Sequence, residues 1–212
     1  MPPASSLASA IAPLSAEPVR TALLFDVDGT LAPIVRDPQA SSVPELTRRL
    51  LIDCQAIYGL IGCVSGRQAK EARRIVGIGS IPYSGNHGLE LLPRGAHEPT
   101  VNAEAEAWTD RVHAAALDAF PELRAPVTSN KADAVHALLD GVDVDNALYV
   151  DDDRTDLDAF RALRALQHEG RLKEVLCVGV RSEQTPSELL AEADLLVDGT
   201  EGVSSLLSAL AD

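Results

Sequence analysis

Residues 21–31, Thr-Ala-Leu-Leu-Phe-Asp-Val-Asp-Gly-Thr-Leu, pass abruptly from an apolar run into an acidic loop. The apolar run over 21–25 is typical of a buried strand in a parallel sheet, because both faces of such a strand are covered. Asp26 and Asp28 follow two positions apart, so both can reach one centre at the end of the strand. Taken alone, Asp-Gly after a strand is more often a simple turn, and its meaning depends on the rest of the chain.

The rest of the chain alternates between short apolar runs and amphipathic segments. Apolar runs that predict further strands lie at residues 60–64, 81–83, 147–150, 175–180 and 195–197. Segments that predict helices lie at residues 42–57, 67–76, 102–120, 131–139, 155–166 and 186–193, and a last one begins at Glu201. This alternation predicts an α/β fold with a mainly parallel sheet covered by helices on both faces.

Composition limits the partners and the compartment that we expect. The 212 residues carry a formal net charge of -14, which repels phosphate backbones and anionic lipid surfaces. Neither nucleic acid nor a membrane is therefore an expected partner. Cys54, Cys63 and Cys177 show no metal-ligand spacing and are interpreted as buried thiols of a cytoplasmic protein. Residues 1–20, rich in Ala, Ser and Pro, are expected to form a flexible tail. The sequence indicates no oligomeric state.

A second acidic cluster follows the predicted strand at 147–150. It consists of Asp151, Asp152, Asp153, Asp156 and Asp158. Such a run is usually a solvated loop that leads into a helix, since carboxylates favour helix N-termini. In open α/β sheets, however, ligands bind beyond the carboxyl ends of the strands, where both acidic clusters are expected to lie. Two carboxylate clusters would repel each other there unless a cation lay between them. Hard oxygen ligands suit magnesium, so Mg²⁺ is the predicted cofactor.

Ser65 and Lys131 add two groups that suit a phosphate. Considered singly, Ser65 is interpreted as part of a Ser-Gly turn and Lys131 as a surface helix residue. Beside a cation they fit a phosphoryl group, whose transfer depends mainly on positioning and charge neutralisation. An aspartate can serve as the nucleophile and form an acyl phosphate that water cleaves, while a second carboxylate moves the proton.

Four short motifs resemble, in order, the signatures of haloacid dehalogenase (HAD) phosphatases. They are Asp26-Val27-Asp28-Gly29-Thr30-Leu31, Val64-Ser65-Gly66-Arg67, Asn130-Lys131, and Asp152-Asp153 with Asp156. Residues 31–38, 84–90 and 152–160 are further similar to stretches typical of trehalose-6-phosphate phosphatases. The resemblance implies a Rossmann-like HAD core. It also implies a magnesium-dependent phosphomonoester hydrolase that takes a small sugar phosphate, trehalose-6-phosphate, in trehalose biosynthesis.

The resemblance also implies a role for each site residue. Asp26 would be the nucleophile and Asp28 the general acid/base, while Ser65 and Lys131 would grip the phosphate. The metal would be held by Asp26, the Asp28 carbonyl and Asp152, with Asp153 or Asp156 in support. Substrate contacts are expected from Arg67, Asn86, His87, Glu122 and Arg124. For His87 the alternative is that it simply holds its own loop through a backbone hydrogen bond.

The chain departs from this family in its cap, the insertion that closes over the sugar. Only about forty residues separate Glu90 from Lys131, which leaves room for little beyond one helix around Trp108. We therefore expect a core of residues 21–90 and 127–212 and a truncated cap at 91–126. Glu122 and Arg124 resemble the end of the usual cap. Asp151 stands where a glycine is usual, and its extra carboxylate can alter metal affinity.

Two other functions remain open on the sequence alone. A nearly capless phosphatase can act more broadly, on other sugar phosphates or small phosphate esters. A phosphatase-like module that lost turnover with its cap would be regulatory instead. The retained set of Asp26, Asp28, Ser65, Lys131 and Asp152 argues against this last reading, because uncompensated carboxylates are costly to keep together.

Overall fold

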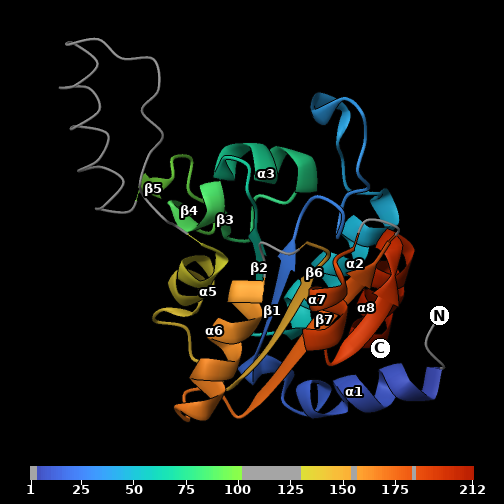
Figure 1. Ribbon diagram of the computed structural model, residues 1–212. Helices are drawn as coiled ribbons and strands as arrows, with labels where there is room; N and C mark the ends of the chain where they lie inside the picture. The colour runs from blue at the N-terminus through green and yellow to red at the C-terminus, as the bar shows by residue number, and fades with distance from the viewer. Residues whose placement is uncertain (1–3, 102–129, 154–156, 183–184) are drawn as a thin grey trace.

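The described part of the chain forms one central sheet with helices on both faces (Figure 1). The computed structural model describes residues 4–101, 130–153, 157–182 and 185–212. Eight strands in these ranges are ordered β5-β4-β3-β2-β1-β6-β7-β8. They span β1 Thr21–Asp26, β2 Leu60–Val64, β3 Tyr83–Gly85, β4 Glu90–Leu92, β5 Thr100–Val101, β6 Asn146–Asp151, β7 Glu174–Arg181 and β8 Leu195–Asp198. The predicted α/β fold is confirmed.

The pairing is parallel from β3 to β8, whereas β4 and β5 are antiparallel additions at one edge. Sequence patterning did not anticipate β4 and β5, because strands of two or three residues carry too few positions to show an alternation. Both pair with the core sheet, so residues 91, 92, 100 and 101 belong to it. The predicted truncated cap at residues 91–126 stays a prediction: its first residues extend the sheet, and residues 102–126 lie outside the described residues.

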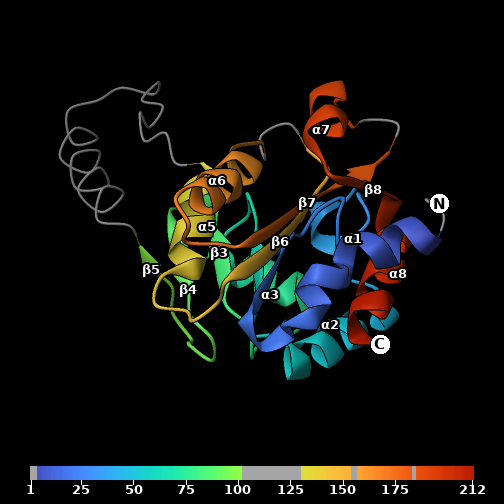
Figure 2. The same ribbon diagram turned by 90° about the horizontal axis from the view of Figure 1, so that it is seen from below.

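Helices cover the two faces of the sheet as two separate layers. The described α-helices are α1 Ala4–Ala16, α2 Glu45–Ile57, α3 Ala69–Val76, α5 Lys131–Leu139, α6 Leu157–His168, α7 Ser187–Glu192 and α8 Gly199–Ala211. Single 3-10 turns lie in the connections: η1 Pro18–Arg20, η2 Pro38–Ala40 and η3 Asn86–Gly88, the last between β3 and β4. Figure 2 shows α1, α2 and α8 on one side of the sheet and α5 and α6 on the other. None of the helices in the described ranges has the length and apolar character needed to cross a membrane.

Alternation along β1 divides the core between these layers. Leu23 and Phe25 face the cluster built with α1, α2, α3 and α8, whereas Ala22 and Leu24 face the cluster built with α5, α6 and α7. All six residues of β1 are buried, which explains why the strand reads as a continuous apolar run. The thiols of Cys54, Cys63 and Cys177 are free and buried within these layers.

The N-terminal segment is a helix, and the expected flexible tail is wrong for residues 4–20. Ile11 and Leu14 of α1 are only 4% and 1% exposed and join the core beside α8. The hydroxyl of Thr21 also donates to the carbonyl oxygen of Leu14 at 3.1 Å. Leu7, Ile11 and Leu14 recur at helical spacing, a signal that the abundant Ala, Ser and Pro obscured.

Leu14→Ala is expected to lower the free energy of unfolding by about 2–5 kcal/mol, because it removes a buried side chain and leaves a cavity. Urea unfolding followed by circular dichroism measures this loss. The matched control is Leu46→Ala in α2, where the leucine is 64% exposed and the change should stay within about 0.5 kcal/mol. Equal, small effects for both variants would mean that α1 does not pack on the core in solution.

Candidate active site

The register of the parallel strands brings three polar side chains to one edge of the sheet. Asp26 at the end of β1 is the Cα partner of Val64, so Ser65 follows immediately on the neighbouring strand. On the other side, Phe25 pairs with Val150, and Asp151 therefore lies beside Asp26. Parallel strands end at the same edge, which is where ligands bind in open α/β sheets. The chain thus assembles residues 26, 65 and 151 from positions far apart in the sequence.

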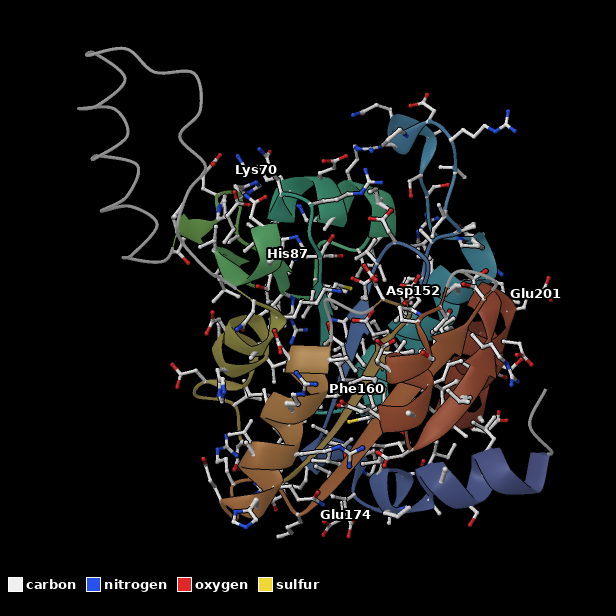
Figure 3. The ribbon with its side chains drawn as sticks, in the orientation of Figure 1. Lys70, His87, Asp152, Phe160, Glu174 and Glu201 are labelled. Carbon is white, nitrogen blue, oxygen red and sulfur yellow. The ribbon has the colours of Figure 1, made fainter. Side chains whose placement is uncertain are left out.

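A cavity of about 360 Å³ opens at this edge. Eight of the residues predicted for the site line it: Asp26, Asp28, Ser65, Arg67, His87, Lys131, Asp152 and Asp153, together with Ile34 and Gly66. Figure 3 shows the labelled side chains of His87 and Asp152 at this same end of the sheet. Asn86 does not line the cavity. Glu122, Arg124 and Asp156 lie outside the described residues.

Lys131 supplies a buried positive charge at the floor of the cavity. Its ammonium Nζ donates to Asp26 Oδ1 at 2.6 Å and to Asp151 Oδ2 at 3.1 Å, and the residue is 3% exposed. Lys131 is the first residue of α5, whose start is fixed by a capping box between Asn130 and Asp133. The cap holds the lysine stem in place, so a side chain that sequence alone presents as a surface residue lies beside the nucleophile candidate.

The carboxylates of Asp26, Asp151 and Asp152 gather around this lysine. One carboxylate oxygen from each lies within 4.8 Å of the others, an arrangement that can hold a metal ion. Burial raises the pKa of Asp26 despite the adjacent Lys131 ammonium. Burial and the charge of Asp151 raise the pKa of Asp152 to about 7. Three carboxylates against one ammonium leave excess negative charge, and a bound cation would relieve it.

Asp152 is held in this cluster by the loop that follows β1. The hydroxyl of Thr30 donates to Asp152 Oδ1 at 3.4 Å, a contact that the motif reading did not assign. Gly29 adopts φ +84, and a Cβ at this position would overlap the Asp152 carboxylate. Glycine is therefore required here both for its left-handed backbone and for the close approach of the carboxylate. Asp153 lines the cavity, but its carboxylate is not part of the described three-aspartate cluster.

Asp28 lines the same cavity but is not one of the three clustered aspartates, and its carboxylate pairs with Arg67. The guanidinium Nε and Nη2 of Arg67 donate to the two oxygens of Asp28 at 2.7 and 2.8 Å, a bidentate pair. Arg67 also donates to Glu71 at 2.7 Å, and the Ser41 hydroxyl donates to Asp28 at 3.3 Å. These bonds raise the pKa of the Arg67 guanidinium. Arg67 therefore orients Asp28, the proposed acid/base. Both residues line the cavity.

The loop 86–88 places His87 against the cavity through an unusual backbone. Asn86 and His87 have φ values of 49° and 56°, which are costly for residues other than glycine. Two hydrogen bonds hold the loop. The side-chain amide of Asn86 donates to the Glu90 carboxylate at 2.7 Å, and the backbone N–H of His87 donates to the Ser65 carbonyl oxygen at 3.1 Å. Asn86 thus fixes the loop here, and its substrate contact stays a prediction.

Glu90 serves this loop as a partner that the sequence interpretation did not assign to the site. Its second oxygen accepts the backbone N–H of Ala69 at 2.9 Å, at the start of α3. A carboxylate near a helix N-terminus is stabilised by the unpaired N–H groups there.

Burial lowers the pKa of His87, and the Lys131 ammonium adds to this effect, so the imidazole is neutral at neutral pH. His87 therefore offers the cavity a neutral donor or acceptor.

Comparison with known protein families supports the motif reading over the first half of the chain. The family model described as trehalose-phosphatase matches residues 24–119. A trehalose-phosphate phosphatase of Mycobacterium leprae is 40% identical over 86 residues, which cover 40% of this chain and 20% of that protein. An uncharacterized glycosyl hydrolase of Mycobacterium tuberculosis is 34% identical over 124 residues, 55% of this chain and 9% of that protein. The chain therefore spans no more than about a fifth of either relative.

Solved structures share the fold over nearly the whole chain. The C-terminal domain of a Candida albicans trehalose-6-phosphate phosphatase superposes with a TM-score of 0.74 at 19% identity, covering 96% of both chains. An Aspergillus fumigatus trehalose-6-phosphate phosphatase gives a TM-score of 0.70 at 20% identity, covering 96% of this chain and 97% of that one. The expected fold is confirmed, since these phosphatases share it, and the resemblance in sequence to trehalose-phosphate phosphatases is confirmed over residues 24–119.

Proposed function

We propose that this protein is a magnesium-dependent phosphomonoester hydrolase that acts through an aspartyl-phosphate intermediate, with trehalose-6-phosphate as its substrate in trehalose biosynthesis. The observation that carries the proposal is the Asp26 carboxylate, which lies in a cavity at the carboxyl edge of the sheet with Lys131 Nζ at 2.6 Å. A carboxylate held in this way can attack phosphorus while the ammonium neutralises the phosphoryl oxygens.

The first chemical step joins Asp26 to the phosphoryl group. A carboxylate oxygen forms a bond to phosphorus while the bond from phosphorus to the ester oxygen breaks, and Asp28 gives that oxygen a proton. Arg67 donates hydrogen bonds to both oxygens of Asp28. At least one of these bonds must break before Asp28 can contact the ester oxygen. In the second step Asp28 takes a proton from water as the water oxygen attacks phosphorus. The bond between phosphorus and Asp26 then breaks, and inorganic phosphate leaves.

Ser65 and Lys131 hold the transferred group in this scheme. The Ser65 hydroxyl oxygen accepts a hydrogen bond from the backbone N–H of Arg67 at 3.1 Å. The hydroxyl hydrogen can therefore be directed toward a phosphoryl oxygen. Lys131 counters negative charge on the same group, at a buried position where electrostatic interactions are strong. His87, which lines the cavity as a neutral imidazole, is proposed to contact the substrate beyond its phosphate. Glu122 and Arg124 stay proposed sugar contacts.

The donor set fits a hard divalent cation, which we propose to be Mg²⁺. Asp26 and Asp152 would hold it with the Asp28 carbonyl oxygen, and Asp153 or Asp156 would support them, as the resemblance implies. Carboxylate and carbonyl oxygens are the ligands that magnesium prefers. When bound, the ion neutralises charge on the phosphoryl oxygens during transfer. The excess negative charge of the Asp26, Asp151 and Asp152 cluster supports this assignment.

A second class of substrate is also proposed, because the segment that would contact a sugar is short. Residues 102–129 are all that lie between β5 and Asn130, which favours broader action on other sugar phosphates or small phosphate esters. The relatives named above support trehalose-6-phosphate. A purely regulatory module is disfavoured, because buried Lys131 and Asp26 are kept in contact at a cost that catalysis explains. A cytoplasmic location is also proposed, and the three buried thiols favour it.

Asp26→Asn is expected to abolish phosphatase turnover, because the nearly isosteric amide cannot attack phosphorus. The fold should persist, since Lys131 keeps its 3.1 Å contact with Asp151. Release of phosphate and circular dichroism on one preparation measure both properties, with Asp53→Asn on the exposed face of α2 as the control. A folded Asp26→Asn protein that kept a substantial fraction of the turnover would exclude Asp26 as the nucleophile.

Turnover is expected to stop in excess chelator and to return when Mg²⁺ is added, because the oxygen donors at the cavity require a hard cation. The measurement is the rate of p-nitrophenyl phosphate hydrolysis across a series of Mg²⁺ concentrations. Aluminium or beryllium fluoride should inhibit the magnesium-loaded protein, since both mimic a phosphoryl group. Full activity in chelator would contradict the metal proposal.

The ratio of kcat/KM for trehalose-6-phosphate over p-nitrophenyl phosphate is expected to be modest. A full cap provides several sugar hydrogen bonds, and losing them at roughly 1 kcal/mol each removes orders of magnitude of preference. Both substrates are assayed on one preparation, and the assay is repeated across protein concentrations. A strong preference for trehalose-6-phosphate would show that residues 102–129, or a neighbouring subunit if the ratio depends on protein concentration, supply the sugar contacts.

A further inference from the structure

Asp151 adds a buried carboxylate behind Lys131, at a position where the phosphatases that the chain resembles usually have glycine. It is the last residue of β6 and is 0% exposed. A buried carboxylate is costly unless it is paired and hydrogen-bonded, so its retention here requires partners. The proposed reaction assigns Asp151 no step. Its contacts therefore bear on how the other groups are held.

The two oxygens of Asp151 serve different parts of the site. Oδ2 accepts from Lys131 Nζ at 3.1 Å, which ties the start of α5 to the end of β6. Oδ1 accepts the backbone N–H groups of Asp152 at 2.6 Å and Asp153 at 3.1 Å. One rigid side chain thus links the phosphate-gripping lysine to the loop that carries the proposed metal ligands. A glycine at this position can make none of these contacts.

We propose that Asp151 is a positioning residue that holds the Lys131 ammonium at a set distance from the nucleophile and fixes the Asp152–Asp153 backbone. This inference rests on the proposed phosphatase function. With two carboxylates as partners, the ammonium is restrained on both sides. Without Asp151, Lys131 would keep its contact with Asp26, and its charge would be held more strongly by the nucleophile, at the expense of the phosphoryl oxygens.

The catalytic test compares Asp151→Asn with Asp53→Asn and wild type on p-nitrophenyl phosphate at saturating Mg²⁺. The amide keeps the size and one carbonyl oxygen but removes the charge that faces Lys131. We expect kcat to fall about tenfold or more while KM changes less than about threefold, because positioning acts mainly on the transition state. Asp151→Gly serves as the second variant if the asparagine protein does not fold. A kcat per folded molecule within twofold of wild type would overturn the proposal.

The second test is a double-mutant cycle in thermal unfolding, run in chelator so that turnover plays no part. In the wild-type background Asp151→Asn should lower the unfolding midpoint, because Lys131 loses a partner. In a Lys131→Met background it should raise the midpoint, because the methionine leaves Asp26, Asp151 and Asp152 repelling one another. A shift of the same sign and size in both backgrounds would mean that Asp151 does not act through Lys131.

The two tests separate failure of this inference from failure of the proposed function. If the wild-type protein hydrolysed no phosphate ester, the proposed function would fall, and the sign of the midpoint shifts would still decide whether Asp151 and Lys131 are coupled. If the wild-type protein turned over phosphate ester, and Asp151→Asn either kept kcat within twofold of wild type or shifted the midpoint equally in both backgrounds, only the positioning role would be overturned.

Discussion

The contact between Lys131 Nζ and Asp26 Oδ1, at 2.6 Å, joins residues 105 positions apart in the chain. It holds the buried Asp26 carboxylate at the carboxyl edge of the sheet and offsets part of the repulsion from Asp151 and Asp152. A buried charge that loses its partner is strongly destabilising, so the two elements that carry this pair, β1 and α5, must be placed together accurately. The capping box at Asn130 and the pairing of β1 with β2 and β6 achieve this.

The surrounding loops give several charged side chains of the site a defined partner. Arg67 holds Asp28 apart from the three-aspartate cluster, and Glu90 secures the loop that carries His87. Gly29 lets the first loop approach Asp152 closely. These contacts preorganise the site, which would lower the cost of reorganisation in the proposed phosphoryl transfer. The strained φ values at Asn86 and His87 are maintained by the same network.

Much of the architecture follows from patterns that are local in sequence. The run over 21–25 predicted β1 because a strand buried on both faces must be apolar throughout. The helix at Lys131–Leu139 was predicted with its observed bounds. Segments whose pattern is weak or short were not: α1 lies in an Ala-, Ser- and Pro-rich stretch, and β4 and β5 have three and two residues. Their positions depend on the surfaces against which they pack, and a local pattern does not contain those surfaces.

The candidate site, like the fold, was predicted from the sequence only in part. Strand ends and motif spacing determined that Asp26, Asp28, Ser65, Lys131 and Asp152 would meet at one edge, because parallel strands end together. Only the tertiary structure decided that Lys131 is shared between Asp26 and Asp151, that Arg67 pairs with Asp28, and that Asn86 is bound to Glu90. The physical reason is that residue type sets which charges and hydrogen-bonding groups are available. The partner that each group takes depends on distances of a few ångströms, and those are set by packing across the whole fold.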